Sequence, residues 1–492
     1  MKGKNQKMVD LSNYYQRDPG IGDTTPSERF PNNHVSFSPL LMPLHWLDRV
    51  HRIFGSMAFK SKHAMLKEYD SAAPLDACLG TEAELKQVRK LIVSFAEGFD
   101  NNSRISVFGR FFLRRIVLDL LKNRKRVLRF YHSNKEFIET NGKFKAPVII
   151  TGLPRSGTTL LQRLISEDPN TRSPYSFEMN IAIPPMASQA DPLKDPRRKK
   201  SSGRASIFSW LAPGLLEKFR ESHVWLPTEK EESFISMLAH NGISQMNNST
   251  AGKKYINDFY QIEDKRLVFR YERLFFTMLD AYRPVRSHWT LKAPNYAPCF
   301  PILFEEYPDA RVVLAHRNPI VTLPSICRLM ESWCIAFDQD GSFDKHRFGQ
   351  FQKPFIENSL MVPFNYRKTH LEKEDQIFDC MYEELSSDPI AMVKRIYQYF
   401  DLDYTLPFEK RMMAYLKNDS QKKHGRHKYS LEEYGFDADS LYEEYKDYME
   451  HFNFKIPGKA SVIPMCNTLK FVEIIKKSVY HEVPYARKKL TS

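Results

Sequence analysis

APVIITGLPRSGTTLLQRLIS, residues 146–166, is the stretch that decides the fold of this chain. Its β-branched apolar run at residues 148–150 is typical of a strand buried on both faces. Two glycines and a proline then interrupt the pattern, and from Thr158 the apolar residues recur at helical spacing. A strand, a glycine-bearing turn and a helix together direct backbone N–H groups at an anion. The stretch therefore predicts a phosphate-binding loop (P-loop).

One position separates this loop from that of nucleotide-hydrolysing proteins. Their pattern is G-x-x-x-x-G-K-[ST], whereas Thr158 stands here in place of the lysine. A cation appears earlier in the loop, as Arg155. Gly152 and Gly157 allow the backbone to curl closely round an anion. The hydroxyls of Thr158 and Thr159 add further donors, so the loop keeps its anion chemistry without the lysine.

A second informative segment alternates strands with helices. It reads SHWTLKAPNYAPCFPILFEEYPDARVVLAHRNPIVTLPSICRLMES, residues 287–332. We expect strands over 288–291 and 311–315, a short helix over 297–306 between them, and another helix beginning near Thr322. This alternation predicts an α/β fold with a central parallel sheet, the three-layer architecture of P-loop proteins.

Three cations follow the ends of the predicted strands. Arg155, Lys292 and Arg317 each come just after a buried apolar run. Ligands of such sheets bind at the carboxyl ends of the strands. We therefore expect these three side chains to converge on one crevice.

Composition limits the classes of protein that the chain can belong to. Its 492 residues suffice for one large domain with additions or for two domains. No uncharged apolar run is long enough to span a membrane, and residues 1–20 lack the apolar core of a secretory signal. Six cysteines are scattered without C-x-x-C spacing, which argues against a zinc site or a disulfide framework. We expect a cytoplasmic protein.

The net charge of +14 is compatible with an anionic partner. No helix-turn-helix, finger or RRM signature supports nucleic acid as that partner. Helices are expected over residues 40–59 and 82–97. The second should begin at a capping box of Thr81 with Glu84 and end at Gly98, and a basic helix should follow it. Its cations are Arg110, Arg114, Arg115, Lys122, Arg124, Lys125 and Arg126. We favour a solvated face for this helix and core packing for residues 40–59; association with a membrane surface is the alternative for both.

We divide the chain into four parts. They are an irregular segment (1–40), a helical N-terminal extension (41–144), the P-loop domain (145–455) and a C-terminal tail (456–492). Within the P-loop domain, IFDCMYEEL reads as a strand, Asp388 with Pro389 starts a helix, and DSLYEEYKDYMEHF reads as one late helix.

From about residue 135 to 450 the chain resembles the broad group of sulfotransferases that includes bacterial small-molecule enzymes and, more remotely, tyrosylprotein sulfotransferases. The matching pieces are PVIITGLPRSGTTLLQRL, SFEMN, LKAPNYAPCF, ARVVLAHRNPIVTLPSICRL, YEELSSDPIAMVKRIYQYF and GRHKYSLEEYGF. The resemblance implies that a sulfuryl group moves from 3′-phosphoadenosine 5′-phosphosulfate (PAPS) to a hydroxyl acceptor, without a metal. Two features depart from the common cytosolic pattern, which has a lysine where Arg155 stands and a late R-K-G-x-x-G motif that is absent here.

The resemblance also implies roles for individual residues. The 5′-phosphosulfate lies on the P-loop residues Arg155, Ser156, Gly157, Thr158 and Thr159. Arg317 and Ser325 hold the 3′-phosphate, because an arginine offers a bidentate fork and a first helical turn offers N–H groups. Arg426 closes over the donor from a late basic loop, with a solvated loop as the alternative.

Catalysis needs cations at the leaving phosphate oxygen and a base for the acceptor proton. Arg155 and Lys292 are the expected cations. Glu178 stands near the position of the catalytic glutamate of tyrosylprotein sulfotransferases, and His223 is its rival. The alternative for Glu178 is a salt bridge or a helix cap.

Two other classes of function stay open at this point. One is a P-loop kinase acting on a small molecule, and the other is a protein that binds a nucleotide or a membrane without catalysis. The acceptor, whether a small molecule, a lipid or a carbohydrate, cannot be read from the residues, and neither can the oligomeric state.

Overall fold

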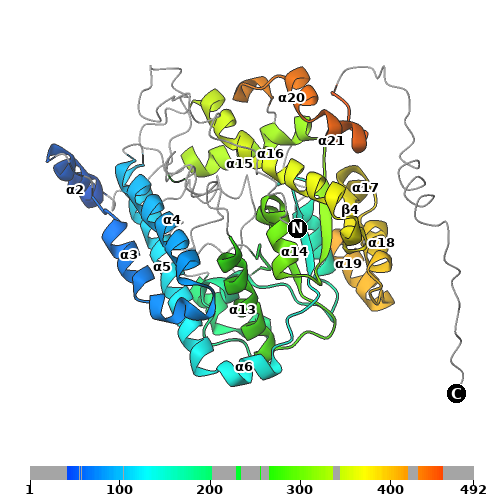
Figure 1. Ribbon diagram of the computed structural model, residues 1–492, viewed down its shortest axis with the longest axis horizontal. Coiled ribbons are helices and arrows are strands. Elements are labelled where there is room, and N and C mark those ends of the chain that lie inside the picture. Colours follow the sequence, from blue (N-terminus) through cyan, green and yellow to red (C-terminus); the bar gives the residue numbers. More distant parts are fainter. Residues whose placement is uncertain are drawn as a thin grey trace, which may run out of the picture.

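The computed structural model describes residues 42–54, 56, 58–102, 105–201, 229–233, 255, 265–335, 344–418 and 430–457. These residues form the predicted α/β fold, in which a parallel sheet lies between layers of helices (Figure 1). In spatial order the strands are β2 (Thr290–Lys292), β1 (Val148–Gly152), β3 (Arg311–His316) and β4 (Ile377–Met381). Every neighbouring pair is parallel, so the carboxyl ends of all four strands share one edge.

The apolar run of β1 is explained by its burial on both faces. Side chains alternate along a strand, so Ile149 packs on one face of the sheet while Val148 and Ile150 pack on the other. All three side chains are fully buried. Ile149 pairs in register with Leu291 of β2 and Val312 of β3, which makes β1 a central strand.

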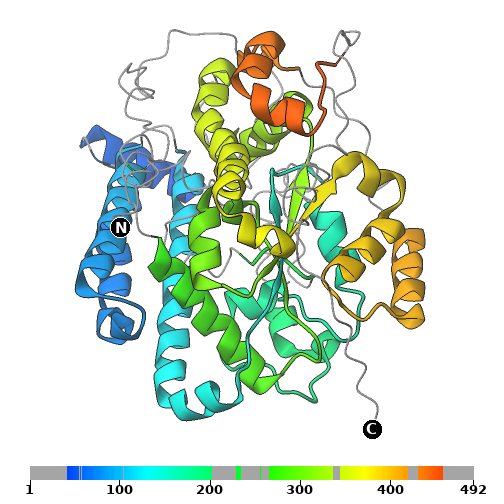
Figure 2. The ribbon, with the colours of Figure 1, turned by 45° about the vertical axis from the view of Figure 1, so that its right-hand side comes forward.

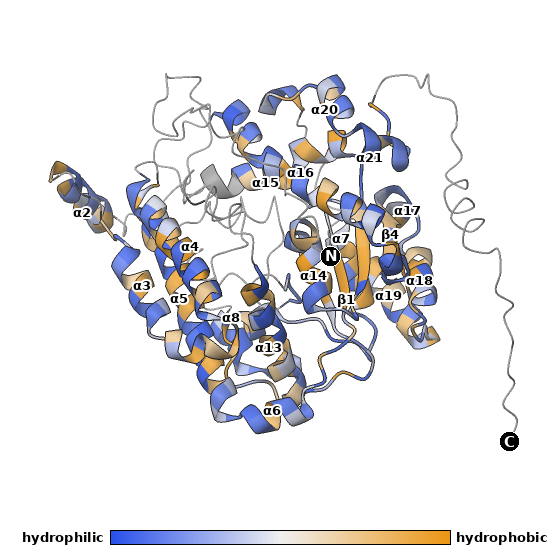
Figure 3. Ribbon diagram, viewed as in Figure 1, coloured by the Kyte–Doolittle hydropathy of each residue, from blue (hydrophilic) through white to orange (hydrophobic). Residues whose placement is uncertain are grey.

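Helices cover each face of the sheet and complete the three layers. The face of Val148 packs against α7 (Thr158–Ile165), α18 (Pro389–Tyr399) and α19 (Leu406–Asn418). The face of Ile149 packs against α13 (Arg266–Tyr282), η5 (Pro294–Cys299) and α14 (Phe300–Glu306). Figure 2 shows the strands between the two helical layers, and Figure 3 shows that they are predominantly hydrophobic.

The predicted helical N-terminal extension is present. It consists of α2 (Met42–Ile53), α3 (Lys62–Asp70), η2 (Ala73–Cys78), α4 (Glu82–Asn101), α5 (Val107–Ser133) and α6 (Lys135–Asn141). Leu91 of α4 and Leu128 of α5 belong to the same apolar cluster as Ile149 of the sheet. The extension and the sheet thus share a core, and the division of the chain into domains near residue 145 stays a prediction.

Helix α4 begins as predicted and ends later. Thr81 and Glu84 form the expected capping box. Gly98 was expected to end this helix, but it lies inside α4, which continues to Asn101. The last turn is held in place because Phe99 is fully buried and the Asp100 carboxylate accepts hydrogen bonds from two backbone N–H groups at the start of α3.

Helices α15 (Pro319–Ile335), α16 (Lys345–Thr369), α20 (Ala438–Glu444) and α21 (Lys446–His451) form a further apolar cluster, to which Leu153 of the P-loop also belongs. Helix α15 starts before the predicted Thr322, because the Asn318 side chain caps it and Pro319 suits its first position. The late segment predicted as one helix is two, separated at Tyr445.

IFDCMYEEL was predicted as a strand throughout, and only its first half is one. Strand β4 ends at Met381, and α17 (Tyr382–Ser387) begins directly after it. The next prediction is confirmed, since the Asp388 carboxylate caps α18, in which Pro389 is the first residue.

The cations of the basic helix α5 were expected to lie on a solvated face, and two of them do not. Arg110 and Arg124 are fully buried. Arg110 donates to the carbonyls of Phe99 and Asn102, at 2.9 and 2.7 Å, and Arg124 forms an ion pair with Asp76 of η2. Both arginines therefore join the helices of the extension to one another. Among the residues that the structure describes, no helix combines the length and the apolar character needed to cross a bilayer.

The Arg124–Asp76 pair generates a stability prediction. Asp76→Ala leaves a fully buried guanidinium without its counter-charge, and such losses cost roughly 3–5 kcal/mol. Asp70→Ala is the matched control, because its partner Arg89 and Asp70 itself are exposed, and exposed pairs contribute at most about 1 kcal/mol. Urea denaturation of both variants measures the difference. Equal losses in the two variants would contradict this account of the extension.

Candidate active site

The P-loop joins the end of β1 to the start of α7 through residues with positive φ. Gly152, Arg155 and Gly157 have φ values of 125°, 69° and 85°. At Gly152 an added Cβ would lie 2.3 Å from the Ala315 carbonyl oxygen of β3, so only glycine fits there. The loop is therefore pressed directly against the neighbouring strand.

The N-terminus of α7 faces the loop without a side-chain cap. Gly157 is the N-cap residue and has no side chain to accept from the first-turn N–H groups. Ser156 is fully buried, and its hydroxyl donates to the Leu153 carbonyl at 2.6 Å, which closes the turn. Thr158 is buried as well, whereas Arg155 is exposed. The loop thus offers a helix N-terminus and one exposed cation to an anion.

Three of the predicted donor-binding residues form one contact group, the arginine group. Arg155 Nε donates to Ser325 Oγ at 3.2 Å, and Arg317 Nη1 donates to the Arg155 carbonyl at 2.6 Å. The Arg317 guanidinium lies 3.9 Å above the centre of the Tyr382 ring. Tyr382 also approaches Gly157, since an added Cβ on that glycine would lie 3.3 Å from the ring. The P-loop, the connection after β3, α15 and α17 (Tyr382–Ser387) therefore each contribute one residue to this group.

A second contact group, the lysine group, lies at the start of α7. Lys292, at the end of β2, is 1% exposed. Its ammonium donates to Thr159 Oγ1 at 3.3 Å and forms an ion pair with the Glu232 carboxylate. Arg155 and Thr159 belong to the same loop and helix start, so the P-loop connects the two groups.

Glu232 is held in place by its neighbours. The Ser233 N–H donates to the Lys292 carbonyl at 2.9 Å, and Ser233 Oγ lies 2.6 Å from the Tyr296 hydroxyl. Burial, together with the nearby Glu272 carboxylate, raises the pKa of Tyr296 well above its ordinary value, so this phenol stays neutral. The Gln162 amide of α7 donates to the Glu231 carbonyl at 3.0 Å. These contacts fix the backbone on both sides of Glu232.

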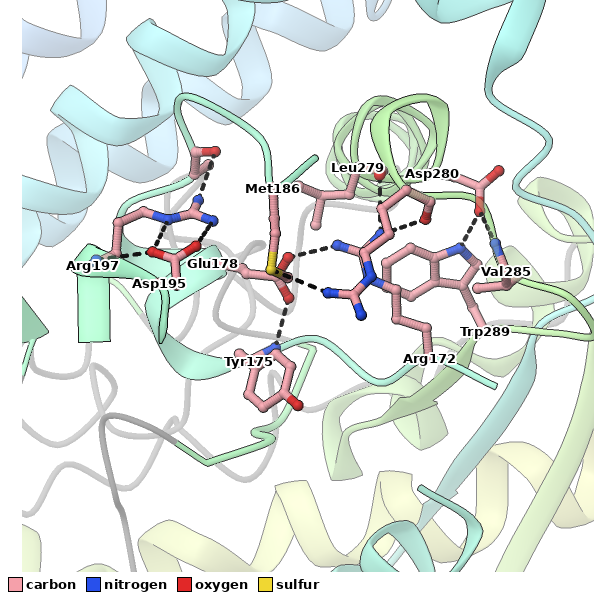
Figure 4. Close-up of polar contacts among 12 residues, drawn as sticks. Arg172, Tyr175, Glu178, Met186, Asp195, Arg197, Leu279, Asp280, Val285 and Trp289 are labelled. Carbon is pink, nitrogen blue, oxygen red and sulfur yellow. Dashed lines mark hydrogen bonds and ion pairs between the residues drawn. The ribbon is translucent and has the colours of Figure 1, made fainter. Parts of the chain in front are cut away.

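Glu178 lies in a different set of contacts, shown in Figure 4. It is fully buried in α8 (Ser176–Asn180), and one carboxylate oxygen accepts from Arg172 Nη2 at 2.5 Å. The other oxygen accepts from the Tyr175 N–H at 3.2 Å. Arg172 in turn packs 4.5 Å above the Trp289 ring. Glu178 therefore has the salt-bridge and capping contacts that were its alternative reading, and neither is to a P-loop residue.

His316 precedes Arg317 in the chain, but within the described residues its ring has no hydrogen bond to the P-loop. His316 is buried, with its ring nitrogens 2.8 Å from the Tyr448 hydroxyl and from an Asp379 carboxylate oxygen. Burial opposes ionisation of Asp379, but the hydrogen bond from His316 and the charge of Arg367 outweigh it and lower the pKa of this carboxyl. His316 is thus part of the framework behind β3. His223 and Arg426 lie outside the described residues.

Sequence reasoning did not single out Glu232. It follows Glu229 and Glu231 in a glutamate-rich segment, and nothing in the spacing distinguishes it from these two. Its partner Lys292 is sixty residues away in the chain. Only the folded backbone brings the two together.

Comparison with known proteins agrees with this geometry. A model of the sulfotransferase family matches residues 147–406, which include the P-loop and both contact groups. The chain is 22% identical over 308 residues to omega-hydroxy-beta-dihydromenaquinone-9 sulfotransferase Stf3 of Mycobacterium bovis, a match that covers 58% of this chain and 71% of the relative.

Two solved structures share the fold. The sulfotransferase STF9 from Mycobacterium avium matches with a TM-score of 0.67 and 21% identity, covering 82% of this chain and 99% of that chain. The sulfotransferase STF1 from Mycobacterium tuberculosis matches with a TM-score of 0.62 and 21% identity, covering 77% and 98%. Because the family model spans more than half of the residues, this chain belongs to the sulfotransferase family.

Proposed function

We propose that this sulfotransferase takes its sulfuryl group from PAPS and transfers it to a hydroxyl of a small-molecule, lipid or carbohydrate acceptor. The observation that carries the proposal is the arginine group, in which Arg155, Arg317 and Ser325 contact one another beside an uncapped helix N-terminus. PAPS has phosphates at both ends of its ribose, so it needs two anion sites close together. A loop that contains one arginine and accepts a hydrogen bond from a second meets that need.

The positions of the hydrogen-bond donors suggest which part of PAPS each residue binds. The backbone of Ser156, Gly157 and Thr158 and the hydroxyl of Thr159 are proposed to bind the 5′-phosphosulfate. Arg317 and Ser325 are proposed to bind the 3′-phosphate. Arg155 lies between these two sets of donors, because its side chain contacts Ser325 and its carbonyl accepts from Arg317.

In the transfer step the acceptor oxygen forms a bond to sulfur while the bond from sulfur to the phosphate oxygen breaks. Negative charge then grows on that phosphate oxygen, and preorganised cations stabilise it. Arg155 and Lys292 are proposed for this role. Lys292 suits it because its ammonium is buried, where charge interactions are stronger than in water, and contacts the first turn of α7.

The acceptor's proton needs a base, for which resemblance favours Glu178 and geometry favours Glu232. Both oxygens of Glu178 are occupied by Arg172 and by a backbone N–H. Glu232 instead contacts Lys292, which we place at the reacting end of the donor. We therefore propose Glu232 as the base. A proton arriving on this carboxylate removes the counter-charge of Lys292 just as the leaving oxygen becomes negative.

The acceptor class is proposed from a relative. The name of Stf3 describes a hydroxylated menaquinone as its substrate, which is a lipid. A lipid alcohol is accordingly the first acceptor to test here, before a carbohydrate or a polar small molecule.

Loss of the cations should separate catalysis from donor binding. We expect Arg155→Ala and Lys292→Ala to lower transfer by about 10²–10³-fold, as for other losses of a transition-state donor. Arg317→Ala should mainly weaken binding of adenosine 3′,5′-bisphosphate, by roughly 10–100-fold for a lost charge-assisted hydrogen bond. Transfer of labelled sulfate from PAPS to a lipid extract measures the first effect, and calorimetry measures the second.

Two controls accompany these variants. Arg395→Ala removes an exposed arginine paired with Glu384 on the surface, and it should change neither quantity. Transfer should also persist in a metal chelator, whereas a kinase that needs Mg²⁺ would stop. Full turnover in Arg155→Ala or Lys292→Ala would disprove the proposed mechanism.

The proposed base has a matched control in its own segment. Glu232→Gln keeps the side-chain volume but removes the charge, and we expect turnover to fall about 10²–10⁴-fold, the usual contribution of a general base. Glu229→Gln, at an exposed position three residues earlier, should leave turnover unchanged. Donor affinity should survive in both variants. If Glu232→Gln loses donor affinity but keeps its turnover, the residue positions Lys292 instead of accepting the proton.

Glu178 should behave as a structural residue. Glu178→Gln leaves the buried Arg172 guanidinium without its counter-charge, so we expect the free energy of unfolding to drop by about 3 kcal/mol. The turnover of the folded fraction should stay within about tenfold of the wild type. Loss of a general base would lower it by about 10²–10⁴-fold instead. Denaturant titration and active-site titration give the two values. Unchanged stability with a large loss of turnover would return the catalytic role to Glu178.

A further inference from the structure

Large exposed apolar side chains gather on one short helix. Among the described residues, Met42, Trp46, Ile53 and Phe54 are 66%, 67%, 75% and 81% exposed, and all four belong to α2 or directly follow it. Met42, Trp46 and Ile53 recur at intervals that place them on one helical face. Figure 1 shows α2 at the outer edge of the molecule, at the end of the N-terminal extension. This outward face was expected to pack into the core, and that expectation is wrong.

Helix α2 leaves its tryptophan in solvent and buries an aspartate instead. Its one buried residue is Asp48, which accepts from Arg52 Nε at 2.7 Å and from the Ala58 N–H at 3.4 Å. A polar residue thus faces the protein while the tryptophan faces outward. Leu44, Leu47 and Val50 are only half-buried, so the contacts of α2 with the protein leave its largest apolar side chains in water.

The same face carries positive charge. Arg49 is exposed, and the helical spacing places it beside Met42 and Ile53. Residues 42–63 contain four Lys or Arg and one Asp. Arg52 is paired with Asp48 and Lys62 with Glu97, so Arg49 and Lys60 carry the positive surplus at this end of the molecule. Tryptophan and aliphatic residues mixed with arginine on one face are typical of helices that lie in the interface of a membrane.

We propose that the outward face of α2 docks on an anionic lipid surface. A second copy of the chain fits the face less well, because its cations would repel their counterparts across a two-fold axis. A helix of twelve residues is only about 18 Å long, and one face of it falls well short of the ~800 Å² that each partner of a stable dimer buries. A membrane needs no such area, since apolar side chains enter the lipid while cations meet the headgroups.

The proposal goes beyond the sulfuryl transfer proposed above, because docking requires neither donor nor acceptor. Docking through α2 would place the proposed sulfuryl transfer at a membrane surface. An enzyme held at a bilayer meets a lipid alcohol at far higher local concentration than one in bulk water.

Vesicle co-sedimentation of the full chain tests the proposal. The probes are vesicles of phosphatidylcholine alone and vesicles with about one third phosphatidylserine. We expect binding to the anionic vesicles that weakens with added salt, and weak binding to the neutral ones. Trp46→Ala with Ile53→Ala should reduce the partition coefficient by at least about tenfold, since two interfacial anchors are lost. Arg49→Glu should do so through charge alone.

The matched control removes two exposed leucines elsewhere. Leu371→Ala with Leu406→Ala deletes side chains that are 61% and 72% exposed, and vesicle binding should not change. Thermal unfolding and binding of adenosine 3′,5′-bisphosphate should match the wild type in every variant, which separates this test from that of the donor site.

Three outcomes would overturn the proposal. They are the absence of binding to anionic vesicles, equal loss in the leucine control, and wild-type binding by both α2 variants. A concentration-dependent dimer that Trp46→Ala with Ile53→Ala dissociates would assign the face to a second copy instead.

Discussion

The close parallel pairing of β1 with β3 is the constraint on which the site depends. Gly152 lies so near the Ala315 carbonyl that no side chain fits between them, and the P-loop therefore leaves β1 directly beside the end of β3. From there Arg317 reaches the carbonyl of Arg155, and Ser325 of the following helix reaches its side chain. A wider spacing of the two strands would separate both arginines from each other. The rest of the sheet supports this one contact by burying β1 on both faces.

The second contact group depends on the other neighbour of β1. Strand β2 ends at Lys292, whose carbonyl also accepts the Ser233 N–H. The strand thereby supplies the buried ammonium through its side chain and holds the adjacent carboxylate through its backbone. Strand β2 therefore sets the geometry of the whole ion pair. This explains how Glu232, which lies in a segment without regular secondary structure, is held close to Lys292.

The sequence carried much of this information in local patterns. Strand, loop and helix could be predicted from residues 146–166. The rule that strand ends share an edge predicted that Arg155 and Arg317 lie close together, whereas Ser325 was expected beside them from the resemblance. Local patterns failed where the outcome depends on distant partners. Arg124 looks like any solvated arginine of a basic helix until Asp76 is placed beside it, and Glu232 is one of several similar glutamates until β2 is formed. Helix ends failed for the same reason, since Gly98 would end an isolated helix but Phe99 is buried after it.

The Lys292–Glu232 pair has a consequence for selectivity. The Lys292 ammonium already forms an ion pair with the Glu232 carboxylate, so an incoming anion must compete with this carboxylate for the ammonium. A small anion such as chloride or inorganic sulfate would gain only its contact with Lys292. That single contact would not offset the loss of the Lys292–Glu232 ion pair. Under the proposed function, a nucleotide with several phosphate and sulfate oxygens would recover the loss through its other contacts with the arginines and the loop. In the proposed site, an internal counter-ion of this kind would keep the buried ammonium from holding common small anions.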